Sequence, residues 1–322
     1  MNLPRLSVVV PNYNHGAFLP TCLNALLNQS VPPFEVIVID DASTDNSMAV
    51  IEEFAARHPN IRAFRNDRNR GVVYNLNLGL ELARGEFVFF PAADDEVQAG
   101  LFEKSLRLLA EHPQAALSCT VSQWHDVATG LSWHMAVGMA DRPCFLSPAE
   151  LVQLGRQGRL IICTSSAIMR TGPLRKIGGF NSELRWHCDW FAVTVPALRH
   201  GICFVPESLS DFYLHPTSYY NRGRRTPEHR AVLARLLEQL SAPACADVAP
   251  LIRESAVLSL FGLPVLGLLA RRKYRALLSP LLVWRAARRS AELVGKRLLP
   301  RPVARFCLHL FYRRKNGVSV GD

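Results

Sequence analysis

The sequence predicts an α/β fold with a doubly wound, mostly parallel sheet, followed by a basic helical region. Short apolar runs rich in Val, Ile and Phe alternate with segments of helical periodicity through the first third of the chain. This alternation is typical of parallel βαβ units. The 322 residues can bury one full core and still carry a second region, and 49% hydrophobic with 20% charged residues is the composition of a folded chain.

The first elements follow one another closely. The predicted strands are 7–10, 35–39, 61–65 and 86–90, and the predicted helices between them are 18–29, 47–57 and 72–83. Ligands of such sheets bind beyond the carboxyl ends of parallel strands. The polar segments PNYNH, DDASTD and AADDE follow predicted strands, so we expect them to share one crevice.

From residue 101 the pattern is less regular. The predicted helices are 101–111 and 190–200, the predicted strands are 115–121, 160–169 and 202–206, and the stretch containing Trp124 and Trp133 shows few regular signals. After about residue 221 the composition changes to Leu, Ala and Arg. We therefore expect a first region over 1–221 and a basic, amphipathic helical region over 222–322.

The net charge of +10 is unevenly spread. The residues from Arg222 to the end contain 20 Lys and Arg against 6 Asp and Glu, a net charge of +14, which leaves −4 for the first 221 residues. This charge predicts an anionic partner for the tail, and membrane lipid is favoured over nucleic acid.

The tail also contains an apolar run of 16 residues from 255 to 270. It is shorter than the ~20 residues that span a bilayer, and Pro264 interrupts it. With the clustered arginines and Trp284 that follow, the run predicts an in-plane membrane anchor. A buried helical hairpin packed on the first region is the alternative.

Eight cysteines are present, without a CxxC pair or metal-ligand spacing. Most lie in apolar surroundings, which favours reduced thiols in a cytoplasmic protein over disulfides in an exported one. The start MNLPRLSVVV reaches strand-like sequence at once and shows no signal peptide.

Three segments in order resemble a family 2 glycosyltransferase with the GT-A fold and inverting chemistry. They are LSVVVPNYNHGAFLPTCLNALLNQSVPPFEVIVIDDASTDNS, GVVYNLNLGLELARGEFVFFPAADD and GGFNSELRWHCDWFAVTVPALRHGICFVPESLSDFYLHPTS. The resemblance covers about residues 6–218. It implies a nucleotide-sugar half over about 1–98 and an acceptor half over about 99–221.

Asp94 and Asp95 are adjacent carboxylates at a predicted strand end, where Mg²⁺ or Mn²⁺ would relieve their repulsion and neutralise a diphosphate. The resemblance implies that Asp95 is the metal ligand and that Asp94 lies nearer the ribose and phosphates, with Asp94 itself and His215 of the His-Pro segment as further candidate ligands. The alternative is a helix N-terminal cap for 101–111. The family often has Asp where this chain has Ala92, which puts metal affinity in doubt.

The resemblance also implies a nucleotide-sugar site formed by Pro11, Asn12, Tyr13, Asp41, Gly71 and Asp94. In this site Asp41 accepts the N3–H of a uracil-type base, Tyr13 packs near the base, and Gly71 permits close approach of a phosphate. An Asx-turn before the helix at residue 47 is the alternative for Asp40 and Asp41.

Asp189 is the candidate catalytic base, because an inverting transfer needs a group that takes the acceptor hydroxyl proton. The family commonly has Glu-Asp where this chain has Cys188 and Asp189. A helix N-cap is the alternative for Asp189. Trp186 and Trp190 flank it as a candidate acceptor-binding platform or, equally, as core residues.

We therefore expect an inverting, metal-dependent glycosyltransferase that moves a sugar from a nucleotide-sugar, with UDP-sugars favoured, to a saccharide or lipid-linked hydroxyl acceptor. Bacterial cell-surface polysaccharide assembly at the inner face of the plasma membrane fits the basic tail. A nucleotidyltransferase is one alternative, although VPNYNHG lacks the basic, Gly-rich triphosphate loop of that class. A nucleotide-sugar-binding protein without turnover is the other.

Overall fold

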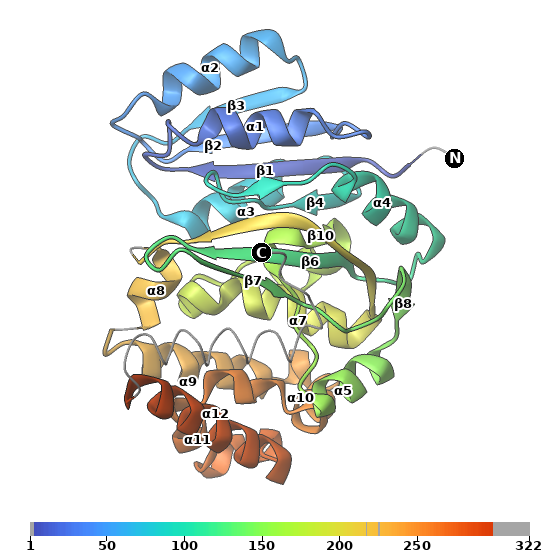
Figure 1. Ribbon diagram of the computed structural model, residues 1–322, viewed down its shortest axis with the longest axis vertical. Helices are drawn as coiled ribbons and strands as arrows, with labels where there is room; N and C mark the ends of the chain where they lie inside the picture. The colour runs from blue at the N-terminus through green and yellow to red at the C-terminus, as the bar shows by residue number, and fades with distance from the viewer. Residues whose placement is uncertain (1–2, 217, 225, 299–322) are drawn as a thin grey trace. The chain divides into compact units, whose positions relative to one another are not determined.

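The structure is a computed structural model that describes residues 3–216, 218–224 and 226–298 (Figure 1). It divides into two compact units. Unit 1 comprises Met1–Pro148 and Ile161–Thr226, and unit 2 comprises Ala149–Leu160 and Pro227–Asp322. Cys307 and the rest of the basic tail beyond residue 298 lie outside the described residues. The seven described cysteines form no disulfide with one another.

Unit 1 is built on one mixed sheet with helices packed around it (Figure 1). Its elements are β1 (Leu6–Asn12), α1 (Leu19–Leu27), β2 (Glu35–Asp40), α2 (Ser47–Arg57), β3 (Ile61–Arg65), α3 (Val72–Leu82), β4 (Phe87–Phe89), β5 (Glu96–Val97), α4 (Leu101–Glu111), β6 (Leu117–Asp126), β7 (Leu131–Met135), β8 (Cys144–Leu146), the 3₁₀ helix η1 (Thr164–Ser166), β9 (Ile168–Arg170), α6 (Thr171–Lys176), the 3₁₀ helix η2 (Ser182–His187), α7 (Cys188–His200), β10 (Ile202–Leu214) and α8 (Tyr219–Arg224).

The sheet order is β3-β2-β1-β4-β9-β6-β10-β5, with β7 paired to β6 and β8 paired to β10. Strands β3, β2, β1 and β4 are parallel. Strand β9 runs antiparallel between β4 and β6, and β10 is parallel to β6. The predicted α/β class is confirmed, and the first four predicted strands lie in the parallel part of the sheet.

Side-chain alternation along β1 explains why helices cover both faces of this half. Val8 and Val10 join the core cluster with residues of α1 and α2. Val9, between them, points to the other face (period two of a strand) and meets α3 at Gly79. A Cβ atom on Gly79 would come within 2.1 Å of Val9 Cγ1, so glycine allows α3 to approach the sheet closely.

In the second half of unit 1 the structure departs from the sequence pattern at two places. The segment 160–169 is a strand only at its end, because η1 turns the chain there and Ser166 Oγ bonds the Thr120 backbone (N–H and C=O, both 3.1 Å). The stretch with Trp124 and Trp133 is regular. It forms the end of β6 and β7, which pair in register at these two tryptophans.

Unit 2 is helical and contains α5 (Pro148–Gln157), α9 (His229–Leu240), α10 (Ala249–Ser255), α11 (Leu263–Leu269) and α12 (Pro280–Leu298), joined by the 3₁₀ helices η3 (Pro243–Cys245), η4 (Val257–Phe261) and η5 (Arg272–Leu277). Helix α5 comes from the part of the chain predicted to belong to the first region. It packs on α10 where Gly155 meets Ser255, and the Arg285 guanidinium of α12 donates to its Gly155 carbonyl.

The apolar run 255–270 bends in unit 2. Ala256 and Gly262 have positive φ angles of 56° and 64°, which separate η4 from α10 and α11. Its apolar side chains Val257, Leu258, Val265, Leu268 and Leu269 are buried. Most of the run is therefore core of unit 2 rather than a continuous in-plane helix, while Leu263 within it is 54% exposed. Among the described residues, no helix is long and apolar enough to cross a bilayer.

Candidate active site

The loop after β2 and the loop before α3 are joined by Asp41. Its Oδ1 accepts hydrogen bonds from Asn66 Nδ2 at 2.7 Å and Arg70 N–H at 2.8 Å, and its Oδ2 accepts from Gly71 N–H at 2.8 Å. Gly71 has φ 85°, which favours glycine. Oδ2 keeps an acceptor position, since a carboxylate oxygen can accept two hydrogen bonds. The structure thus brings together two of the residues predicted to contact the nucleotide.

Asp40 Oδ2 accepts from Ser43 N–H, three residues on, at 3.1 Å, whereas the Asx-turn directly before α2 is made by Asp45, whose Oδ1 accepts from Ser47 N–H at 3.0 Å. Asp40 is fully buried, forms an ion pair with Arg65 at 3.5 Å and accepts from Asn12 Nδ2 at 3.0 Å. Asn12 is buried beneath the turn at Asp40, so its side chain supports the loop. The Asn12 Oδ1 atom is buried without a hydrogen bond.

Tyr13 and Pro11 stand at the end of β1. The Tyr13 side chain is 45% exposed, so its ring is available to pack against a base. Pro11 is half-buried and pairs with Ile39 in the β1–β2 register, which sets the direction in which the chain leaves the sheet.

The acidic pair lies after β4, in a turn closed by the bond from Asp95 N–H to the Ala92 carbonyl at 3.2 Å. Asp95 is 5% exposed, and its Oδ1 accepts from Tyr213 N–H of β10 at 3.4 Å. Burial raises the pKa of Asp95 well above its usual value, and the negative charge of Asp94 raises it further. A cation bound here would offset both effects.

His215 reaches the acidic pair from the end of β10. Its Nε2 lies 3.6 Å from Asp94 Oδ2, and both side chains are partly exposed. The His215 carbonyl accepts from Asn221 Nδ2 at 3.0 Å, which fixes the turn that follows. Asp94, Asp95 and His215 therefore lie together, although 121 residues separate Asp94 from His215 in sequence.

The donor chemistry of these residues fits a divalent cation shared with a diphosphate. In the described part of the chain, no group of three or more His, Cys, Asp or Glu side chains is arranged to hold a metal ion unaided. Nucleotide-bound Mg²⁺ typically takes one or two protein carboxylates, with phosphate oxygens and water completing the shell. The buried, electrostatically strained Asp95 beside Asp94 is suited to that role.

Asp189 lies in the first turn of α7, and His187 rather than Asp189 is the N-cap residue. Asp189 Oδ1 accepts from Trp190 N–H at 2.6 Å, and Oδ2 accepts from Thr164 Oγ1 of η1 at 3.4 Å. Burial raises the pKa of Asp189. These two hydrogen bonds lower it by less, so the pKa is raised overall. A carboxylate with a raised pKa is a stronger proton acceptor.

The two tryptophans that flank Asp189 differ in exposure. Trp186 is 5% exposed, and its ring lies under α8, 6.1 Å from the Tyr219 ring and against Gly223. Packing therefore accounts for Trp186, and an acceptor could reach its face only if α8 moved. Trp190 is half-buried and stays a candidate for acceptor contact.

Two further groups were not predicted. Asn66 Nδ2 donates to Asp41 Oδ1 and to Asn75 Oδ1, both at 2.7 Å. Asn66 directly follows the carboxyl end of β3. A search for polar residues at strand ends, which found the other segments, could therefore have found it. Thr164 carries no such signal in the sequence.

A chain of polar and aromatic contacts supports the acidic pair from β10. Asp211 accepts from Gln98 Nε2 at 2.5 Å and lies 2.7 Å from His125 Nε2. The His125 ring stacks on Tyr213 at 5.0 Å, and Tyr213 N–H donates to Asp95. These contacts fix the strand that holds Asp95.

Comparisons with known proteins place the chain. A model of the family described as "Glycosyl transferase family 2" matches residues 7–178. An uncharacterized glycosyltransferase, YibD, of Escherichia coli (strain K12) is 27% identical over 251 residues, which cover 74% of this chain and 71% of that protein. A PGL/p-HBAD biosynthesis glycosyltransferase of Mycobacterium bovis is 27% identical over 220 residues, which cover 67% of this chain and 75% of that protein.

Solved structures of similar fold contain nucleotide-sugars. The S. aureus TarS 1–349 complex with UDP-GlcNAc matches with a TM-score of 0.62 at 20% identity, over 78% of this chain and 70% of that one. The mannosyltransferase PcManGT from Pyrobaculum calidifontis, in complex with GDP-Man and Mn²⁺, matches with a TM-score of 0.55 at 21% identity. The match covers 88% of this chain and 84% of that one. At these identities the likeness shows the fold.

Proposed function

Because the chain belongs to glycosyl transferase family 2, we propose that it moves a sugar from a nucleotide-sugar to a hydroxyl acceptor with inversion at the anomeric carbon. The observation that carries this proposal is the meeting of Asp94 and His215 at 3.6 Å, beside the buried Asp95. Two segments distant in sequence thereby meet at the carboxyl edge of the parallel strands, where ligands of such sheets bind, and this supports a cation and diphosphate position there.

In the proposed reaction, Asp189 accepts the proton of the acceptor hydroxyl while that oxygen attacks the anomeric carbon. The bond from this carbon to the diphosphate oxygen breaks, and the electron pair leaves with the nucleoside diphosphate. A bound Mg²⁺ or Mn²⁺ supplies charge neutralisation for that leaving group. Asp94, Asp95 and His215 would hold it, with Asp95 as the principal ligand. Asp189 alone supplies the base, since Cys188 replaces the family's preceding acid.

For the nucleotide, the remaining acceptor position on Asp41 Oδ2 supports contact with a base N–H, and the exposed Tyr13 ring supports packing on the base. Uracil N3–H is such a group, and UDP-sugars are the donors that we favour. The Gly71 loop, held by Asp41, presents backbone close to where phosphates would lie. Pro11 and Asn12 contribute by shaping and supporting the turn between β1 and this loop.

We place the protein in the cytoplasm, at the inner face of the plasma membrane, where it would act on a saccharide or lipid-linked acceptor in cell-surface polysaccharide or glycolipid assembly. The biosynthetic name of the Mycobacterium bovis relative supports this role. The positive charge of unit 2 supports contact with an anionic membrane surface.

The test is thermal-shift screening with a panel of UDP- and GDP-sugars, each with and without Mn²⁺. We expect one donor class to raise the melting temperature only when Mn²⁺ is present, and we expect Asp41→Ala to remove that shift. Stabilisation by every nucleotide alike, or by none, would contradict the proposed donor site.

A further inference from the structure

Apolar side chains lie on the outward face of α12. Val283 is 42% exposed and Trp284 is 57% exposed, and Ala287 continues the exposed side one turn later. On the opposite side of the helix, Leu282 and Ala286 are fully buried in unit 2. The helix is therefore apolar on both sides, whereas a surface helix of a globular protein usually exposes charged or polar residues.

Leu263, at the start of α11, widens this exposed area. Its side chain is 54% exposed, and its N–H donates to Ser290 Oγ at 3.2 Å. Ser290 follows Val283 by seven residues, so it lies on the same side of α12. We call Leu263, Val283, Trp284 and Ala287 the apolar face. Up to residue 291, every large hydrophobic side chain of unit 2 that is exposed belongs to it.

Cationic side chains border the apolar face. The Arg288 guanidinium lies 5.0 Å from the centre of the Trp284 ring, and Arg289 is exposed. The described residues of unit 2 carry 14 Lys and Arg against 6 Asp and Glu, a net charge of +8. The sequence after residue 298 adds five Lys and Arg and one Asp, so it strengthens the positive charge. A partner that covers this face must be apolar and anionic.

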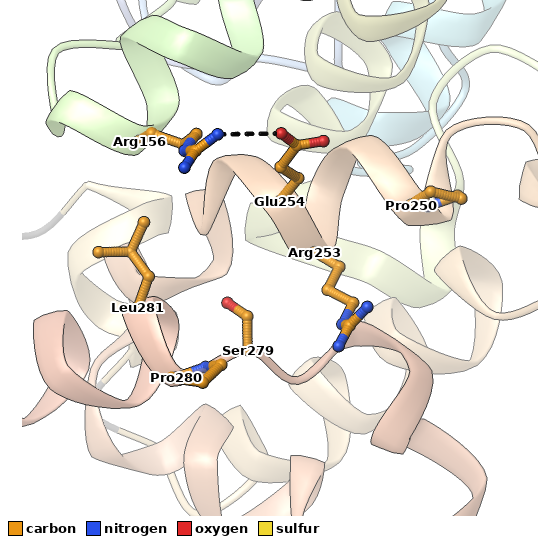
Figure 2. A pocket seen from close by; sticks show the side chains of 7 residues that line it. All are labelled: Arg156, Pro250, Arg253, Glu254, Ser279, Pro280 and Leu281. Carbon is orange, nitrogen blue, oxygen red and sulfur yellow. Dashed lines mark hydrogen bonds and ion pairs between the residues drawn. The ribbon is translucent and has the colours of Figure 1, made fainter.

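Unit 2 contains a groove of about 520 Å³ (Figure 2). Pro280 and Leu281 of the first turn of α12 line it, and Leu281 precedes Trp284 by three residues, which places both on one side of the helix. Figure 2 shows the Arg156–Glu254 ion pair (3.2 Å) at one end of the groove.

Arg253 supplies an unneutralised charge in the groove. Its Nε donates to the Leu278 carbonyl at 2.9 Å, and its terminal nitrogens form no ion pair with a described carboxylate. The Ser279 side chain also lines the groove. A guanidinium and a hydroxyl beside an apolar wall match the phosphate and acyl chain of a lipid.

We propose that the apolar face is the surface through which unit 2 docks on an anionic lipid bilayer, with Trp284 inserted at the level of the headgroups and a headgroup phosphate held by Arg253. A helix with bulky apolar residues outward and arginines at its sides lies in the plane of the interface. This assignment rests on the membrane location in the proposed function and names the residues responsible. It replaces a continuous anchor over the apolar run 255–270, in which Leu263 is the only large apolar side chain that is exposed.

The test uses the full chain and vesicles of phosphatidylglycerol with phosphatidylethanolamine, compared with vesicles of phosphatidylcholine alone. Co-sedimentation should favour the anionic vesicles and weaken with salt. The double variant Val283→Ser, Trp284→Ser should lower the partition coefficient at least about tenfold, because two large apolar side chains no longer leave water. Val127→Ser, at a 52% exposed position in unit 1, is the matched control and should bind like the parent.

The role of Arg253 in the groove is tested by comparing two arginine variants. Arg253→Gln should lower binding to anionic vesicles about fivefold or more, and Arg272→Gln, which removes the same charge from an exposed position outside the groove, should lower it less. Equal losses would remove the headgroup site. Parental binding by the double variant, or equal binding to both kinds of vesicle, would overturn the docking face. A change from dimer to monomer in the double variant, with unchanged vesicle binding, would assign the face to a second copy instead.

Donor turnover separates this inference from the proposed function. Release of nucleoside diphosphate, measured without vesicles, should be unchanged in the double variant, because the apolar face is in unit 2 and the predicted catalytic residues are in unit 1. A failed docking face leaves turnover intact. A failed enzymatic proposal leaves vesicle binding intact.

Discussion

Asp94 Oδ2 lies 3.6 Å from His215 Nε2, which joins the turn after β4 to the end of β10. Asp95, the next residue, is tied to the same strand through Tyr213 N–H. The acidic pair is therefore held between two parts of unit 1 that are distant in sequence. Cation binding should depend on both parts, and each can be changed separately.

Replacing His215 by Ala should weaken Mn²⁺-dependent binding of UDP by about tenfold, the lower end of the loss usually seen when a partner of a metal site is removed. Titration calorimetry with UDP, with and without Mn²⁺, measures this. His58→Ala, at the C-terminus of α2, is the control and should bind like the parent. An unchanged Mn²⁺ effect in His215→Ala would separate His215 from the cation site.

Replacing Asp95 by Asn should reduce Mn²⁺-dependent UDP binding more strongly, by at least about tenfold, because the neutral side chain is a poorer ligand. The melting temperature should stay equal or rise, since Asn carries no charge to bury and none to repel Asp94. Asp141→Asn, at an exposed position, serves as control. A large fall in melting temperature together with parental Mn²⁺ affinity would make Asp95 a structural residue.

The pH dependence of turnover should follow Asp189. The base must be ionised, so turnover at saturating donor should fall as the pH falls through the raised pKa of Asp189. Thr164→Val removes a hydrogen bond that favours the ionised form of Asp189, so the pKa of Asp189 should rise further. The acid limb of the pH–turnover profile should then move to higher pH. Ser165→Ala, which changes the adjacent residue that bonds Ser122, should leave the limb in place. A limb that does not move in Thr164→Val would contradict Asp189 as the titrating group.

Packing of α3 on the sheet should depend on Gly79. An alanine there would bring Cβ within 2.1 Å of Val9, at a cost of about 1–3 kcal/mol of unfolding free energy. Gly172→Ala, with no atom within 4 Å of the added Cβ, should be neutral or slightly stabilising. Urea unfolding of both variants measures the difference. Equal stability would mean that α3 shifts without cost.

The elements of unit 1 up to α4 were predictable because the sequence patterns that form them are local. The sequence indicates β3, α2 and α4 with their observed bounds, since apolar runs, helical spacing and turn residues agree there. The second half depends on distant pairing. Residues 123–126 extend β6 only because β7 and β10 pair with them, and η1 forms because Ser166 bonds Thr120.

The candidate site likewise has a part that the sequence predicts and a part that depends on packing. Strand ends placed Tyr13, Asp41 and Asp95 at one edge of the sheet, as expected. No sequence signal linked Asp41 to the Gly71 loop, because that contact depends on how the loop after β3 folds. Burial of Trp186 under α8 likewise depends on packing that spacing does not reveal.

The central claim is that this site transfers a glycosyl group with Asp189 as base. The most direct measurement is release of nucleoside diphosphate at saturating donor and Mn²⁺ by the parent and by Asp189→Asn, with donor affinity measured on both. The account predicts unchanged donor affinity and a turnover lower by about 10²–10⁴-fold in the variant. Turnover near the parental rate in Asp189→Asn, or no release from any nucleotide-sugar by the parent, would contradict it.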